Sequence, residues 1–423
     1  MCHPLEASRG RRPLLTICGG GNAGHALAVV ASQNFDGDID WLVGSEKKAD
    51  LLRHGMSTTD GLHSTGVITA EANRLRTISS EPAEVIPDAD MVMIAVPAFV
   101  HAAVLRRIRP YMSDATTIGC LPTRGGFEFE AAQLAPRDGG TSRRIFGLQT
   151  LPWSTRVVRP GKVVNIGAAK AEVVLAALPA GDGAGIAARL TEILGTHVVP
   201  TEGFLNLTLG NPGQFIHPGL MYGHFRSWHG EEYDGDGIPM LYADATDEIG
   251  ALVDGLSNDA IAVARAVEVE SGNAVNLKEV VPVHDWLRSS YGHVTGDLST
   301  VATCFRTGPI QARKAPMIEV RPGRFVPDFG YRYLREDVPF GLVITRALAE
   351  IVNVGTPVID EVICWAQSAM QKIYLVGGEL VGRDARGLPI PQHHGVSTPS
   401  DLIEWYSDDS AEAPRSRAYS PPL

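Results

Sequence analysis

The sequence is poor in features that mark several large classes of protein. It has only 5 cysteines among 423 residues, and these are Cys2, Cys18, Cys120, Cys304 and Cys364. None forms a Cys-x-x-Cys pair, so the sequence indicates neither a disulfide framework nor a metal site. Free thiols are typical of a reducing compartment, and we therefore expect a cytoplasmic protein.

Long apolar runs and an excess of basic residues are also lacking. No run approaches the ~20 apolar residues of a membrane-spanning helix, and residues 1–13 lack the apolar core of a signal peptide. The formal net charge of −11 argues against nucleic acid and against an acidic membrane surface as partners. The composition, 44% hydrophobic and 20% charged, is that of an ordinary globular chain with two or three domains.

The most informative segment is the turn that follows the first apolar run. Its pattern Gly19-x-Gly21-x-x-Gly24 leads into an Ala-, Leu- and Val-rich stretch, which predicts a strand, a tight turn and a helix. Gly19 permits the turn, Gly21 lets a pyrophosphate approach the backbone, and Gly24 lets the helix pack on the strand. With Asn22 and Ala23 at the start of the helix, the segment predicts a dinucleotide site.

The rest of the first 200 residues alternates between short apolar runs and helix-like segments. Such alternation predicts an α/β fold, a Rossmann-type doubly wound parallel sheet buried on both faces. Val163–Ala168 and Thr196–Val199 are expected to extend this sheet. The other strand candidates are Ile39–Val43, Met91–Val96, Thr117–Leu121 and Ile145–Leu148.

The pattern changes after Pro200. Apolar residues spaced by three and four predict helices over 244–267, 338–352 and 358–375. We therefore predict a dinucleotide-binding domain over 1–200 and a mainly α-helical substrate domain over 201–405. Residues 406–423, rich in Ser, Asp and Pro, are predicted to be a disordered tail.

The end of the second predicted strand bears on the choice between NAD and NADP. An acidic residue there binds the ribose hydroxyl, whereas small or basic residues accommodate a 2′-phosphate. The tip carries no carboxylate at that position unless Glu46 folds back. Ser45, Lys47 and Lys48 are candidate phosphate ligands, with a solvated helix start as the alternative for the lysines. NAD and NADP both remain open.

Two further loops follow predicted strands and reach the same edge of the sheet. Pro97 and Ala98 follow the run over 91–96, which places them beside the nicotinamide end of a bound dinucleotide. Thr123 and Arg124 follow the run over 117–121, and Arg124 either binds a carboxylate or faces solvent. Both loops are candidates for cofactor or substrate contacts, and plain connections are the alternative.

Two clusters in the second half carry groups suited to proton transfer. The first is the stretch from Asn211 and Gly213 to His217, and histidine is the side chain most easily tuned to exchange a proton near neutral pH. The second, residues 327–341, contains Arg332 and Asp337 just before an apolar helix. A structural histidine and a helix capped by Asp337 are the alternatives.

Taken together, these segments resemble the octopine dehydrogenase family of opine dehydrogenases. The resemblance covers nearly the whole chain, excluding the first dozen residues and the tail. The His-Pro-Gly and Arg-Tyr-Leu-Arg-Glu-Asp-Val-Pro segments are specific in combination, whereas the glycine motif is generic. The matching segments are Cys18–His25, Val96–His101, Leu121–Phe129, Leu151–Arg156, Phe215–Trp228 and Pro327–Gly341.

The resemblance implies a reaction and a set of roles. Such enzymes condense an amino acid with a 2-oxo acid such as pyruvate, and NADH or NADPH reduces the imine to a secondary amine dicarboxylate. His217 matches the acid/base histidine, Asp337 its orienting carboxylate, and Arg332 a clamp for a substrate carboxylate. The expected partners are these small molecules, bound in a cleft between the domains, with a homodimer as an open option.

The stretch before His217 departs from the family pattern. Where the octopine enzyme has bulkier residues, including an aromatic one, this chain has Asn211 and Gly213. These residues are expected to line the amine-donor pocket, so arginine is not assumed to be the donor. Thr123 and Arg124 also depart from a neutral counterpart and are further candidate substrate contacts.

Two rival functions share this layout. Simple NAD(P)-dependent reductases of 2-oxo or 3-hydroxy acids, such as ketopantoate reductase, also join a Rossmann half to a helical half, and they typically use a lysine as the acid. A dinucleotide-binding protein without catalysis is the second rival. The fold alone does not separate these functions, so the choice depends on the site residues.

Overall fold

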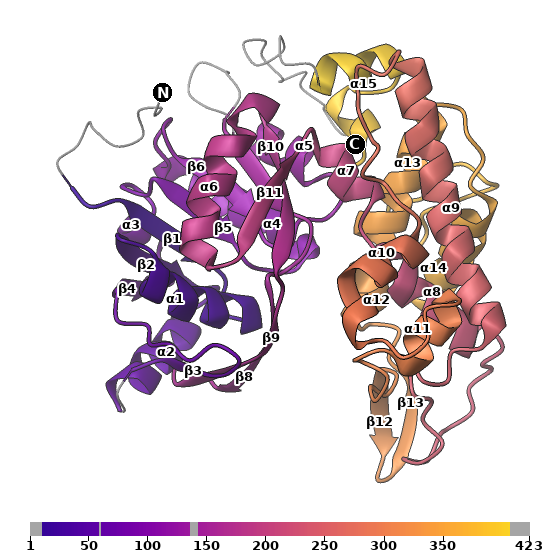
Figure 1. Cartoon of the computed structure of the whole chain (residues 1–423), viewed down its shortest axis with the longest axis horizontal. Coiled ribbons are helices and arrows are strands. Elements are labelled where there is room, and N and C mark those ends of the chain that lie inside the picture. Colours follow the sequence, from indigo (N-terminus) through magenta and orange to yellow (C-terminus); the bar gives the residue numbers. More distant parts are fainter. Residues whose placement is uncertain (1–10, 59–60, 136–142, 407–423) are drawn as a thin grey trace. The chain divides into compact units, whose positions relative to one another are not determined.

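A computed structural model describes residues 11–58, 61–135 and 143–406 of the chain (Figure 1). The described residues form two compact units. The first holds those within 11–123 and 127–207 together with 405–406, and the second holds 124–126 and 208–404. The tail predicted over 406–423 lies outside the described residues, except for residue 406.

The first unit is built on an eight-stranded sheet in the order β11-β10-β7-β6-β5-β1-β2-β4. The six strands from β7 to β4 are mutually parallel, while β10 is antiparallel to β7 and parallel to β11. The predicted doubly wound sheet is therefore confirmed, with two reversed strands at one edge. The strands are β1 (Leu14–Cys18), β2 (Asp38–Leu42), β4 (Leu75–Ser79), β5 (Met91–Ile94), β6 (Thr117–Cys120), β7 (Ile145–Leu148), β10 (Glu172–Leu178) and β11 (His197–Thr201).

The strand order reverses between β1 and β5. From β1 the chain runs outward through β2 to β4, and it then returns to β5 on the other side of β1. In doubly wound folds this switch point, at the carboxyl ends of the strands, is where ligands bind. The turn after β1 and the loop after β5, both predicted to contact the cofactor, therefore meet there.

Helices connect the strands, and burial on both faces explains why strands such as β1 and β7 are wholly buried. Helix α1 packs against α6, and α4 packs against α5. The α-helices of this unit are α1 (Asn22–Asn34), α2 (Glu46–Ser57), α3 (Pro82–Val85), α4 (His101–Ile108), α5 (Phe127–Leu134) and α6 (Gly183–Leu194). Its 3₁₀ turns are η1 (Ala98–Val100), η2 (Arg109–Tyr111) and η3 (Ala180–Asp182).

One predicted strand joins a different sheet. The run over Val163–Ala168 forms β9 (Val163–Ala169), which pairs with β3 (His63–Gly66) and β8 (Trp153–Arg159) in a separate three-stranded sheet. The prediction that this run extends the main sheet is therefore wrong. Its place beside β7 is taken by β10, whose last four residues are buried, whereas the last three residues of β9 are exposed. The prediction for 196–199 is confirmed by β11.

The second unit is mainly helical and is organised around α8 (Gly213–Phe225). The long helix α9 (Asp247–Glu270) runs alongside it (Figure 1), and a Cβ at Gly219 of α8 would lie 2.7 Å from the Val253 side chain. The remaining elements are α10 (Val283–Tyr291), η4 (Gly292–Val294), α11 (Val301–Thr307), the hairpin β12 (Met317–Arg321) and β13 (Arg324–Pro327), α12 (Arg332–Arg335), α13 (Val343–Ile351), α14 (Pro357–Ala369) and η6 (Pro391–His394). Helices α7 (Phe204–Leu209) and α15 (Pro399–Tyr406) each contribute residues to both units. No helix in the described ranges is both long and apolar enough to cross a bilayer.

The helix predicted over 338–352 begins with a wide turn. Residues Val338–Leu342 form the π-helical segment η5, in which the Val343 N–H donates to the Val338 carbonyl, and α13 follows directly. Pro339 lies in the first turn and has no N–H to donate. Asp337 precedes the segment but makes no side-chain cap, so the interpretation of this carboxylate as a helix cap is wrong.

Candidate active site and cofactor-binding turn

The turn after β1 is fixed between two neighbouring strands. Gly19 has a φ of +132°, and a Cβ there would lie 2.5 Å from the carbonyl oxygen of Ala95, just beyond β5. The Trp41 indole of β2 donates to the Gly19 carbonyl at 2.8 Å. Since φ in this region and the close approach both exclude a side chain, only glycine fits this position.

The other two motif glycines differ from each other in their surroundings. A Cβ at Gly24 would lie 1.8 Å from the Gly19 carbonyl oxygen, so Gly24 lets α1 pack against the turn. A Cβ at Gly21 would meet no atom within 4 Å. Gly21 precedes α1 without any side-chain cap, so no capping side chain accepts from the amides of the first turn. This uncapped cradle fits the pyrophosphate of a dinucleotide.

The buried His25 side chain holds the glycine turn in place through two hydrogen bonds, and the sequence alone does not predict this role. Its Nδ1 donates to the Gly21 carbonyl at 2.8 Å, and its Nε2 accepts from the Gly161 amide at 3.1 Å. Burial, with a smaller contribution from the charge of Lys48, outweighs the Gly21 hydrogen bond and lowers the pKa of His25 to about 4. His25 is therefore neutral near pH 7. In the sequence, only its position directly after Gly24 of the glycine motif links His25 to the turn.

The other predicted cofactor contacts are placed as follows. Asn22 turns its side chain to β8, where Oδ1 accepts from the Val157 amide at 2.8 Å, so Asn22 offers a ligand its backbone. Pro97 is exposed and precedes η1, which begins with the buried Ala98. Ala23 is partly buried in the first turn of α1.

The tip of β2 has a basic rather than an acidic face toward the turn. Ser45 caps α2 by accepting from the Lys48 amide, and Glu46 is held by Ser80 and Arg53. Lys47 is exposed in the first turn of α2. The Lys48 stem lies over the turn, with Cε 3.0 Å from a Cβ placed on Gly20.

The second unit brings His217 and Asp337 together across 120 residues of sequence. His217 Nδ1 on α8 lies 2.8 Å from Oδ2 of Asp337, which precedes η5. Because an ionised carboxylate only accepts, Nδ1 carries the proton and Nε2 is the nitrogen left to exchange one. Asp337 is completely buried, whereas the His217 side chain is 19% exposed. The pair thus has a sheltered carboxylate and an accessible ring.

Tyr333, which was not among the predicted site residues, stacks on the imidazole. The Tyr333 ring stacks on His217 with centroids 3.9 Å apart and an interplanar angle of 15°. Arg313 donates to the Tyr333 hydroxyl at 2.6 Å. The stack and the Asp337 hydrogen bond together restrict the ring in two directions. In the sequence, only the position of Tyr333 next to Arg332, within the segment that resembles the family, links it to the site.

Arg124 lies on the other side of the carboxylate. It is only 7% exposed, and its Nε is 3.2 Å from Asp337 Oδ1. The alternative that Arg124 faces solvent is therefore wrong. Burial alone raises the pKa of Asp337, but the charge of Arg124 and the hydrogen bond from His217 outweigh it and hold that pKa below its usual value.

Gly213 lies next to the His217–Asp337 pair, and Asn211 lies against Gly213. The Gly213 amide donates to Asn211 Oδ1 at 2.9 Å. A Cβ at Gly213 would lie 3.4 Å from Asp337 Oδ1 and 3.7 Å from His217 Nδ1. The absence of a side chain at this position therefore leaves room beside both groups.

The remaining two predicted residues make contacts with other groups. Arg332 is half exposed, and its Nε lies 3.7 Å from Oε2 of the buried Glu336. Thr123 is buried in the first unit, where its amide donates to the Leu148 carbonyl. The second unit thus collects every predicted catalytic or substrate residue except Thr123.

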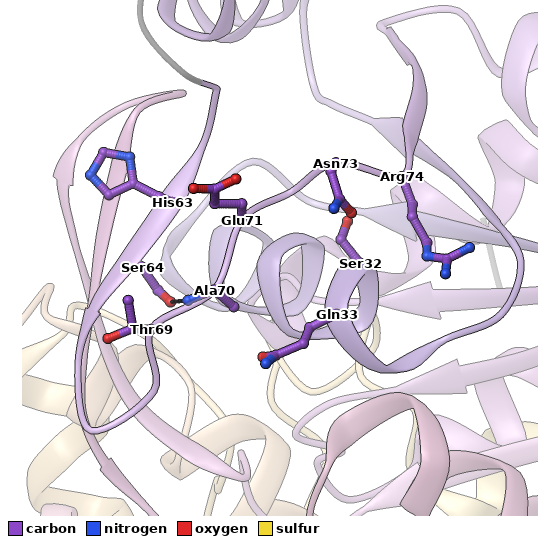
Figure 2. A pocket seen from close by; sticks show the side chains of 9 residues that line it. All are labelled: Ser32, Gln33, His63, Ser64, Thr69, Ala70, Glu71, Asn73 and Arg74. Carbon is purple, nitrogen blue, oxygen red and sulfur yellow. Dashed lines mark hydrogen bonds between the residues drawn. The ribbon is translucent and has the colours of Figure 1, made fainter.

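A polar groove of about 490 Å³ lies in the first unit at the C-terminal end of α1 (Figure 2). Ser32 and Gln33 of α1 form one wall, and His63 of β3 and the loop up to Arg74 form another. None of the predicted site residues lines it. The glycine turn is at the opposite end of α1, so this groove is separate from the cofactor cradle.

The fold and the site define a class of protein. A glycine turn at the switch point of a doubly wound sheet, with a helical unit that carries a buried carboxylate–imidazole pair, is the arrangement of an NAD(P)-dependent oxidoreductase. Within that class, the chain belongs to the NAD/NADP octopine/nopaline dehydrogenase family, whose alpha-helical domain matches residues 200–370. The resemblance inferred from the sequence is confirmed.

Individual relatives cover nearly all of the chain. An opine dehydrogenase of Haliotis discus hannai is 31% identical over 402 residues, which are 92% of this chain and 97% of that protein. A tauropine dehydrogenase of Arabella iricolor is 31% identical over 401 residues, 92% of this chain and 100% of that protein. A solved structure of octopine dehydrogenase with NADH and L-arginine has a TM-score of 0.82 at 25% identity, covering 92% of this chain and 98% of its own.

Proposed function

We propose that this protein is an opine dehydrogenase that condenses an amino acid or amine with a 2-oxo acid and reduces the imine to a secondary amine dicarboxylate. The observation that carries the proposal is the contact of 2.8 Å between His217 Nδ1 and the buried Asp337. A simple reductase using a lysine as its acid has no need of this pair. The names of the opine and tauropine dehydrogenase relatives support the same reaction.

His217 is the proposed acid and base. Asp337 accepts the Nδ1 proton, which fixes the tautomer and stabilises the positive charge when Nε2 is also protonated. After the amine nitrogen has attacked the carbonyl carbon, Nε2 gives its proton to the departing hydroxyl, which leaves as water. The nitrogen lone pair then forms the C=N bond. Tyr333 keeps the ring in the plane that this transfer needs.

The cradle of the first unit is proposed to hold NADH or NADPH. Gly19, Gly21 and Gly24 shape the turn, and the backbone amides of Asn22 and Ala23 bind the pyrophosphate. When bound, the cofactor supplies the hydride that reduces the imine carbon.

The two ends of the cofactor are proposed to meet different loops. Ser45 and Lys47 lie at the adenosine end, where their hydroxyl and ammonium groups suit ribose or a 2′-phosphate. Pro97 and Ala98 face the nicotinamide end.

The substrate contacts are proposed from the second unit. Arg332 is half exposed and presents a planar guanidinium that matches a carboxylate in two-pronged geometry. Asn211 and Gly213 are proposed to border the amine donor, because they adjoin the imidazole and leave space there. Thr123 is proposed as a further contact from the loop after β6.

We also propose a cytoplasmic location, and a homodimer is the alternative to a monomer that needs testing. The four cysteines in the described part of the chain form no disulfide with one another, and three of them are buried, which suits a reducing compartment. Light scattering of the purified protein would measure its mass in solution and decide between monomer and dimer.

The test is a matrix of amine and 2-oxo acid pairs with NADH and with NADPH, followed by the absorbance of the reduced nicotinamide. Oxidation must require both substrates. Oxidation with the 2-oxo acid alone would instead support a simple reductase, and no oxidation with any pair would contradict the proposal.

The role of His217 is tested in the same assay. His217→Gln should lower kcat by about 10²–10⁴-fold, because proton transfer by a positioned side chain contributes that much. Cofactor affinity, measured by NADH fluorescence, should stay within error. His229→Gln is the control, since His229 is an exposed histidine of the same unit and should keep full turnover.

A further inference from the structure

Four side chains form a row of alternating charge that ends at His217. We call Arg332, Glu336, Arg124 and Asp337 the charge row. Arg124 Nε lies 3.2 Å from Asp337 Oδ1 and 3.9 Å from Glu336 Oε1, and the other Glu336 oxygen lies 3.7 Å from Arg332 Nε. Only Arg332, at the far end, is substantially exposed. The row therefore links a buried site to the surface of the second unit.

Backbone contacts hold the residue at the centre of the row. Gly125, directly after Arg124, donates its N–H to the Phe340 carbonyl of η5 at 2.9 Å. Gly126 has a φ of +81°, and a Cβ there would lie 2.2 Å from the Pro389 carbonyl oxygen. Because the loop is fixed to the segment that follows Asp337, Arg124 cannot swing away from the carboxylate without breaking this anchor.

The contact of Arg124 with Asp337 has an electrostatic consequence for His217. A carboxylate favours an imidazolium beside it, and a guanidinium on the far side of that carboxylate opposes this effect. In a buried cluster the interaction is screened little by solvent or salt. Arg124 thus acts on the imidazole through Asp337 and through its own positive charge.

We propose that Arg124 is a positioning residue that fixes Asp337 and limits how strongly His217 holds its second proton. This inference rests on the proposed function of His217. It assigns the Arg124 guanidinium to a carboxylate of the protein rather than to a substrate.

The charged and aromatic groups around the His217–Asp337 pair come from several elements. Asp337 precedes η5, Arg124 lies in the loop after β6, and Tyr333 of α12 stacks on the ring with Arg313 bound to its hydroxyl. The other helices packed on α8 contribute different contacts. Helix α9 packs apolar Val253 and Leu256 against Gly219, and α14 binds Tyr222 through Glu361.

The experiment is an NMR titration of the His217 ring in the whole protein with ¹³C-labelled histidine, assigned with His217→Gln. It needs no substrate and no turnover. In Arg124→Gln the midpoint should rise by about 0.5–1 pH unit, because a positive charge in contact with the Asp337 carboxylate has been removed. Arg124→Lys should bring the midpoint back toward that of the unmodified protein.

Glu336→Gln tests the charge row by a change that should shift the His217 midpoint in the opposite direction. It removes a negative charge 3.9 Å from Arg124 and should lower the midpoint. If Arg124→Gln does not fold, this variant decides the question. Unchanged midpoints in the variants that fold, or shifts in the opposite directions, would overturn the inference.

Turnover separates this inference from the proposed function. In Arg124→Gln the inflection of kcat/KM against pH should move upward with the NMR midpoint, while KM for the 2-oxo acid stays within about twofold. A large rise in KM with no change in the pH profile would show instead that Arg124 binds substrate. A protein without turnover on any pair would contradict the proposed function, and the NMR midpoints would still decide the role of Arg124.

Discussion

Replacing Gly21 with alanine should weaken cofactor binding at the proposed pyrophosphate site without lowering the stability of the fold. A Cβ at this position meets no protein atom within 4 Å, and its φ of −94° is one that alanine adopts freely. Exchanging glycine for alanine just before a helix costs at most about 1 kcal/mol. The free energy of unfolding of the apo protein should therefore change little.

The same methyl group should interfere strongly with NADH. It occupies the open space over the first turn of α1, where the uncapped amides would otherwise bind the phosphates. Losing one hydrogen bond to a charged group costs on the order of 1.5–3 kcal/mol, which is roughly a 10–100-fold weaker Kd. The effect on binding should thus far exceed the effect on folding.

Fluorescence titration with NADH and thermal unfolding measure the two quantities. Gly185→Ala on α6 is the matched control, because its Cβ also meets nothing within 4 Å, and both NADH affinity and stability should be retained. Gly24→Ala should lose both, because its Cβ would lie 1.8 Å from the Gly19 carbonyl oxygen and the backbone must shift. If Gly21→Ala bound NADH as tightly as the unmodified protein, the cradle would not be the phosphate site.

Substitutions at two further positions probe the imidazole stack and a buried acid. Tyr333→Leu removes the ring that stacks on His217 and should lower kcat about tenfold. Tyr333→Phe keeps the ring, and its kcat should stay within a few fold of that of the unmodified protein. Equal losses of kcat in steady-state assays of the two variants would contradict a role for stacking. Burial raises the pKa of Glu128 to about 7 despite the hydrogen bond from Tyr406, so the protonated acid stabilises the fold at low pH. This stabilisation is complete below the unfolded-state pKa near 4.5 and is lost as pH rises through about 7. Glu128→Gln should therefore flatten the decline in unfolding free energy between pH 5 and 8 by up to about 3 kcal/mol, and an unchanged slope in denaturant titrations would refute this assignment.

The sequence predicted the centre of the sheet better than its edges. Runs such as Met91–Ile94 are buried on both faces and therefore consist almost wholly of apolar residues, a pattern that few other structures share. The stretch Glu172–Leu178, rich in Ala, Leu and Val, cannot be distinguished from a helix by its sequence, because helices use the same residues. The run from Val163 was recognised as a strand but was assigned to the wrong sheet, because the partner of a strand depends on contacts distant in sequence.

The same limit applies to the site. His217 and Asp337 can be identified from the sequence because each lies in a segment that resembles the family. Their contact depends on how α8 and η5 pack, and no local pattern encodes it. Arg124 was recognised as a charged loop residue, but its position against Asp337 follows from the anchoring of Gly125 on Phe340.

The path of the backbone has a consequence for dividing this protein. Residues 124–126 belong to the helical unit and 405–406 to the sheet unit, so no single cut yields two complete pieces. A fragment ending near residue 207 would lose Trp405, whose ring lies 4.8 Å from that of Phe129. The complementary fragment would lack Arg124 opposite Asp337. A chimaera that exchanges halves with a relative must therefore transplant both short segments along with the half to which each belongs.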